Sequence, residues 1–142
     1  MYPAEKRVLE VIGSVLDTEL VPNSHRNNTY KGAINYLKHW STLTDKVLIA
    51  YEVKLNSKHR KYPDFFLIKN TVPLRIEVKD CGSERRIAEE INSLGSLDSE
   101  MWYVIDSNKN IDIIEEQLIR RNKKLKIFHT DKLSEKLKEY YS

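Results

Sequence analysis

Apolar residues recur at helical spacing in the first part of the chain. Over residues 4–20 they follow the i, i+3, i+4, i+7, i+8 pattern that places them on one face of a helix. Pro3 stands just before this stretch, where proline suits a helix start. Residues 34–43 fit a second, short helix that carries Leu37 and Trp40, and we expect Trp40 to lie in the core. The chain therefore begins with helical structure.

The spacing of apolar residues then changes to a period of two. Residues 47–55, 64–68 and 74–80 each have the pattern of a strand, and the third alternates apolar and charged side chains strictly. The polar segments between them, residues 56–62 and 69–73, have the composition of turns. Three successive strands with short connections predict an antiparallel meander.

Helical and strand patterns alternate in the last part of the chain. Ser83, after Gly82, suits the N-cap of a helix that ends near Gly95. A strand, a helix, a strand and a closing helix are predicted beyond it, over residues 102–106, 111–122, 125–129 and 131–141. The whole order predicts an α/β (α+β) protein, with a central mixed sheet flanked by helices.

Composition and charge fit a single domain over residues 1–142. Apolar residues make up 40% of the chain, enough for one core. The formal net charge of +3 permits a polyanionic partner without requiring one. A single cysteine, Cys81, excludes an intramolecular disulfide. Because no signal peptide and no membrane-spanning apolar run is found, we expect an intracellular, cytoplasmic protein with no membrane partner.

Glu77 and Lys79 project from one face of the third predicted strand. The apolar residues of that strand point to the other face, so these two charges occupy a face that a central strand would bury. Burying charge without partners is costly, which makes this face unusual. Asp64 opens the preceding strand, and the short turn between the strands brings it next to Glu77. The sequence thus predicts two carboxylates beside an amine.

This grouping suits the hydrolysis of phosphodiester bonds. Two neighbouring carboxylates hold a hard divalent cation, of which Mg²⁺ is the first candidate. Such a cation polarises phosphorus and lowers the pKa of a bound water, and Lys79 can orient that water or neutralise charge on the phosphate. The alternative is an ion pair of Glu77 and Lys79 on a solvent-facing sheet, with Asp64 a turn residue that follows proline.

The order Pro63-Asp64, a gap, and Glu77-Val78-Lys79, on neighbouring strands after an N-terminal helix, resembles the PD-(D/E)xK nuclease superfamily. Many restriction endonucleases belong to it, and the segments KYPDFFLIK and LRIEVKD are most similar to its TnsA-type and Holliday-junction-resolvase-like branches. The resemblance implies a restriction-endonuclease-like α-β-β-β-α-β core, followed here by an extra C-terminal strand and helices. It also implies a Mg²⁺ cofactor, replaceable by Mn²⁺, on Asp64, Glu77 and the Val78 carbonyl.

The superfamily usually has a further acid on its first helix, and this chain offers three glutamates there. Glu5 lies along the edge of the apolar stripe, whereas Glu10 points to the opposite side. Glu19 shares a face with the stripe but lies at the far end of the predicted helix. We therefore expect Glu5 to complete the catalytic group. The alternative is that Glu5 is a first-turn acid that interacts favourably with the helix dipole.

Basic residues near the motif indicate contacts with a nucleic-acid backbone. We expect a Mg²⁺-dependent endonuclease that prefers DNA to RNA, and a homodimer would let so short a chain act on both strands. The alternatives are an RNA endonuclease, disfavoured because residues 4–20 contain no histidine, and a non-catalytic nucleic-acid-binding subunit of a larger nucleoprotein complex. The expected nucleic-acid-binding residues are Lys58, His59, Arg60, Lys61, Arg85 and Arg86.

Overall fold

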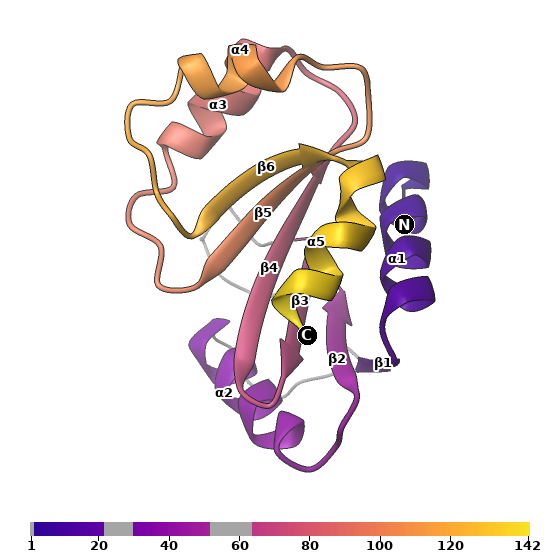
Figure 1. The fold of residues 1–142 in the computed structure, drawn as a ribbon. Helices are drawn as coiled ribbons and strands as arrows, with labels where there is room; N and C mark the ends of the chain where they lie inside the picture. The colour runs from indigo at the N-terminus through magenta and orange to yellow at the C-terminus, as the bar shows by residue number, and fades with distance from the viewer. Residues whose placement is uncertain (1, 22–29, 52–63) are drawn as a thin grey trace.

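The computed structural model describes residues 2–21, 30–51 and 64–142, apart from the side chains of residues 30–33. In this part of the chain, six strands form one mixed sheet in the order β1-β2-β3-β4-β5-β6, flanked by five α-helices (Figure 1). The predicted α/β class with a central mixed sheet is thereby confirmed. The strands are β1 (Thr18–Val21), β2 (Val47–Tyr51), β3 (Phe65–Lys69), β4 (Val72–Lys79), β5 (Glu100–Ile105) and β6 (Leu125–His129), and the helices are α1 (Pro3–Val15), α2 (Tyr30–Ser41), α3 (Glu84–Asn92), α4 (Ile111–Glu116) and α5 (Leu133–Tyr140), the last preceded by a 3-10 turn (Thr130–Lys132).

The middle three strands form the predicted meander. β2 pairs with β3, and β3 with β4, in antiparallel orientation, whereas the other neighbouring pairs are parallel. Parallel neighbours need a crossover, which α2 supplies between β1 and β2, α3 between β4 and β5, and α4 between β5 and β6. The start of β3 and the ends of β4 and β5 consequently lie at the same edge of the sheet (Figure 1).

Helices cover both faces of the sheet. The face of β4 that carries Leu74, Ile76 and Val78 packs against α1 and α5. On the opposite face, Leu37 of α2 packs on β2 and β3, whereas α3 and α4 pack on β5. The charged residues of β4 project from this second face, between the strands that carry its two apolar clusters. They are therefore partly enclosed without being part of either cluster.

A two-residue turn determines how β3 and β4 pair. Asn70 and Thr71 have φ values of 48° and 67°, the left-handed backbone at both central positions that is typical of a type I′ hairpin. The turn pairs Phe65 with Ile76. The residue that precedes Phe65 then lies opposite Glu77, within one residue of the predicted register, although the turn is shorter than the predicted residues 69–73.

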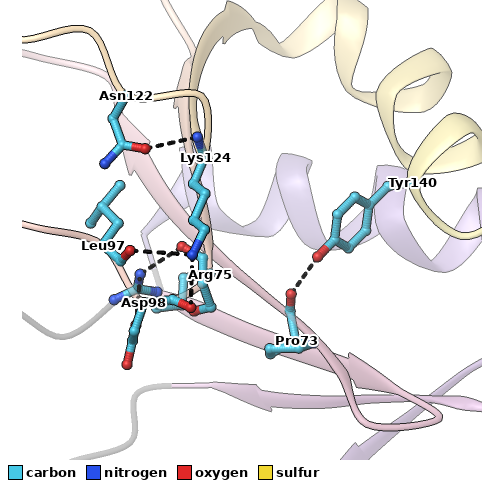
Figure 2. A network of polar contacts seen from close by, with 8 residues as sticks. Pro73, Arg75, Leu97, Asp98, Asn122, Lys124 and Tyr140 are labelled. Atoms are coloured by element: carbon cyan, nitrogen blue, oxygen red, sulfur yellow. Dashed lines mark hydrogen bonds and ion pairs between the residues drawn. The ribbon is translucent and has the colours of Figure 1, made fainter.

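Polar contacts hold the other end of β4 (Figure 2). The Tyr140 hydroxyl of α5 donates to the Pro73 carbonyl over 2.6 Å. Arg75, on the charged face of β4, donates to the Ser99 carbonyl over 2.9 Å and lies 3.4 Å from the Asp98 carboxylate. Arg75 is therefore engaged by the loop before β5, although it is only two residues before Glu77 on the same face of the strand.

The first helix is shorter than the predicted residues 4–20. Leu16 adopts an extended backbone that ends α1, and the next residues form β1 beside β2. Glu19, one of the three candidate acids, is consequently exposed on a strand and not on a helix. Pairing with β2 outweighs the helical spacing in this segment, which begins and ends with β-branched residues.

Two further elements do not match their predicted bounds within the described residues. The helix predicted over residues 111–122 ends at Glu116, and Ile119 beyond it is 80% exposed. The helical spacing of apolar residues beyond Glu116 therefore does not correspond to a buried helix face. The strand predicted over residues 47–55 is present as far as Tyr51, and its remaining residues lie outside the described part of the chain.

The expectation that Trp40 lies in the core is wrong. Leu37 of α2 is fully buried against the sheet, whereas Trp40 of the same helix is 46% exposed and its ring centroid lies 6.1 Å from that of Tyr36. One helix face fits against the sheet, and Leu37 occupies it. Among the described residues, no helix combines the length and the apolar character required to cross a bilayer.

Replacing Thr71 with glycine is expected to stabilise the protein by about 0.5–1 kcal/mol. The left-handed backbone is costly for a β-branched residue, and this gain exceeds the entropy that glycine loses on folding. Chemical denaturation measures the change. Val72→Gly, one residue later in the extended strand, is the control and should destabilise; equal effects of the two variants would contradict the assigned turn.

Candidate active site

The predicted carboxylate pair forms where β3 begins and β4 ends. Asp64 directly precedes β3, and its Oδ2 accepts a hydrogen bond of 2.7 Å from the Val78 backbone N–H of β4. The carboxyl groups of Asp64 and Glu77 lie close enough for each to shift the pKa of the other. The Asp64 side chain thus continues the β3–β4 ladder by one step and is held against the end of β4.

Lys79 lies beside this pair on the same face of β4. Its Nζ is 3.5 Å from the Glu77 Oε1, as the alternation of the strand predicts. Neither side chain faces open solvent, since the Glu77 side chain is 16% exposed and that of Lys79 is 23% exposed. The ion pair of the alternative interpretation is therefore present, but on a partly enclosed face of the sheet and not on a solvent-facing one.

Two further residues, Glu90 and Tyr103, belong to the group and were not predicted from the sequence. Glu90 of α3 accepts from Lys79 Nζ at 2.8 Å through Oε1 and from the Tyr103 hydroxyl at 2.9 Å through Oε2. Tyr103 of β5 pairs with Glu77 in the ladder and is almost completely buried. For Glu90 the sequence contained one signal. It lies three residues after Ile87, which places it on the apolar side of the helix.

Burial and crowding of negative charge shift the acids of the group. Burial is the main cause that raises the pKa of Glu77 to about 8, with the Asp64 charge second, while Lys79 acts in the opposite direction. Burial also raises the pKa of Asp64, although the Val78 N–H and the contact with Glu77 oppose it. At neutral pH the pair therefore shares a proton, carried by Glu77.

Oxygen donors of this kind fit a hard divalent cation. The Lys79 carbonyl faces β5, where it accepts from the Asp106 N–H over 2.8 Å. Successive peptide groups of a strand point to alternate sides, so the Val78 carbonyl is directed to the side where Asp64 lies. Mg²⁺ binds oxygen ligands, and it usually keeps several waters in its coordination shell. The oxygens of the two carboxyl groups and of the neighbouring carbonyl are ligands of this kind. In the described part of the chain, no three His, Cys, Asp or Glu side chains are grouped as metal ligands.

The structure does not bring Glu5 to this group. Glu5 is on α1, which packs against the face of β4 opposite to Glu77, and its carboxylate accepts from the Tyr2 backbone N–H over 3.3 Å. It forms part of a capping box at the start of α1. Glu10 is exposed on the same helix. The placement agrees with the alternative in which Glu5 serves the helix start.

The predicted nucleic-acid-binding residues divide into two sets. Arg85 and Arg86 are exposed in the first turn of α3, which follows β4 after a short loop and so begins at the edge of the sheet that carries the site. Arg85 also pairs with Glu89 over 3.0 Å. The other four, Lys58, His59, Arg60 and Lys61, lie outside the described residues.

Comparison with protein-family models, curated proteins and solved structures finds no match to this chain. What the protein does must therefore be inferred from its own residues.

The Glu77 carboxyl is expected to titrate near pH 8 in the absence of divalent cations. Its pKa should fall in Asp64→Asn, which removes a neighbouring negative charge, and rise further in Lys79→Ala, which removes a positive one. Because an unfolded glutamate ionises near 4.5, the free energy of unfolding should decrease as pH rises from there to about 8. Carboxyl-carbon NMR and denaturation at several pH values check these points; a Glu77 signal that titrates near 4.5 would contradict them.

Proposed function

We propose that the protein is a Mg²⁺-dependent endonuclease that hydrolyses phosphodiester bonds, with DNA as its substrate. The observation that carries this proposal is the convergence of two mutually perturbed carboxyl groups and one ammonium group at a single sheet edge. A hard cation, a phosphate oxygen and an attacking water need such neighbours. The element order from α1 to β5 also contains the α-β-β-β-α-β arrangement of the PD-(D/E)xK nucleases, here with β1 and α2 inserted after the first helix.

Each residue has a role that follows from its position. Asp64, Glu77 and the Val78 carbonyl hold the cation, which when bound polarises the phosphodiester and lowers the pKa of the attacking water. Lys79 keeps its amine beside Glu77, where it can orient that water or offset the charge that develops on the phosphate. Arg85 and Arg86 extend positive charge from the site along the exposed start of α3, where a phosphate chain can lie.

Cleavage by the purified protein should depend on the residues of the site. Supercoiled, single-stranded and branched DNA, and RNA, are incubated with Mg²⁺ or Mn²⁺, and products are separated on gels. Lys79→Ala, Asp64→Asn and Glu77→Gln should each lower the rate by about 10²–10⁴-fold, the usual range for a lost catalytic group.

Asp112→Asn, an exposed acid on α4, is the matched control and should cleave at the parent rate. Equal rates for all four variants would refute the proposal. Cleavage of RNA alone would move the substrate to RNA. Mg²⁺ binding without cleavage of any substrate would favour a non-catalytic subunit of a nucleoprotein complex.

Binding of Mg²⁺ should strengthen with pH. The cation must displace the proton that Glu77 carries, so the affinity should rise about tenfold per pH unit between about pH 6 and 8 and then level off. Titration calorimetry in two buffers of different ionisation enthalpy counts the released protons. An affinity that does not change over this pH range would show that Glu77 does not exchange a proton for the metal.

A further inference from the structure

Glu90 is a partly buried charged residue next to the proposed active site that the proposed reaction does not use. Each of its carboxylate oxygens has a partner, Lys79 Nζ for one and the Tyr103 hydroxyl for the other. These partners come from the adjacent strands β4 and β5, and Glu90 reaches both from α3 above them. The carboxylate therefore joins three elements at one point.

We infer that Glu90 is a positioning residue: it holds the Lys79 ammonium beside Glu77 in the orientation that hydrolysis requires, and Tyr103 fixes Glu90 in turn. The inference rests on the proposed function, and it assigns to α3 a part in the reaction that the sequence motif does not contain.

Geometry makes Glu90, and not Glu77, the main anchor of the amine. Lys79 Nζ is 2.8 Å from Glu90 but 3.5 Å from Glu77, so only the first distance is that of a close charge-assisted hydrogen bond. A lysine side chain loses about 2 kcal/mol of rotamer freedom when it is immobilised, so it needs a partner to stay in one place. Glu90 supplies this partner without occupying the Glu77 oxygens that the cation needs.

Tyr103 provides the rigid end of the chain of contacts. Its ring belongs to the apolar cluster with Ile87 and Ile91 of α3, and it is 1% exposed. The hydroxyl position is consequently set by the core, and the hydrogen bond transmits this position to the Glu90 carboxylate. Displacement of a catalytic group by about 1 Å can cost a hundredfold in rate, which is why such support matters.

The test compares Glu90→Gln, Tyr103→Phe and Lys79→Ala, alone and combined, on the nucleic acid that the parent cleaves. Glu90→Gln should lower kcat about 10- to 100-fold, with KM and the Mg²⁺ affinity changed less than about threefold. Tyr103→Phe changes no charge and should lower kcat less, because Lys79 keeps its carboxylate partner. If Glu90 acts through Lys79, adding Glu90→Gln to Lys79→Ala should cause no further loss.

Glu116→Gln is the matched control, since Glu116 is an exposed acid on α4 and has no part in the proposed site. It should leave kcat unchanged. Circular dichroism and denaturation midpoints show whether each variant is folded, and Tyr103→Phe, the smaller change, serves if Glu90→Gln unfolds.

The outcomes separate the two proposals. Full additivity of Glu90→Gln and Lys79→Ala, or a kcat of Glu90→Gln equal to that of the parent, would overturn the positioning role while the nuclease assignment stands. A loss that appears only in Mg²⁺ affinity would overturn it as well, because Glu90 would then act on the cation. A parent protein that cleaves no substrate would overturn the proposed function, and the positioning role with it.

Discussion

The pairing register of β3 and β4 is the constraint on which the candidate site depends. The two-residue turn at Asn70 and Thr71 fixes this register, and with it the position of Asp64 opposite Glu77. Because side chains alternate between faces, a slip of one residue would place Glu77 on the face packed against α1 and α5. The turn requires a left-handed backbone conformation at Thr71, which is unfavourable for a β-branched residue. The geometry of the site therefore depends on a strained turn.

The candidate site also places charged side chains where burial makes their ionisation unfavourable. β4 presents apolar residues to one face and charged residues to the other, between two apolar clusters. Enclosing Asp64 and Glu77 together disfavours their ionisation, as the raised pKa values express. Such conflicts persist in proteins mainly where function requires them. Glu90 then accepts a hydrogen bond from the partly buried lysine, and Tyr103 donates one to Glu90.

Most of the sheet could be predicted because its strands have local signals. The alternation of apolar and charged residues predicted β4, and the short polar segments between apolar runs predicted the meander. The prediction failed at two places where a local pattern fits two structures. The helix predicted over residues 4–20 ends before residues 18–21, which pair with β2, and Ile119 continues a helical stripe without being buried. In both places the outcome depends on which surface the segment meets, and local spacing does not contain that information.

For the candidate site, the sequence by itself determined Asp64, Glu77 and Lys79, because strand alternation and a short turn are enough to bring them together. Tertiary structure alone decided the rest. The docking of α3 on β5 brought Glu90 to Lys79, and the packing of α1 on the other face of β4 separated Glu5 from the group. The helical period shows which side of a helix is apolar, but only packing shows which strand and which charges that side will contact.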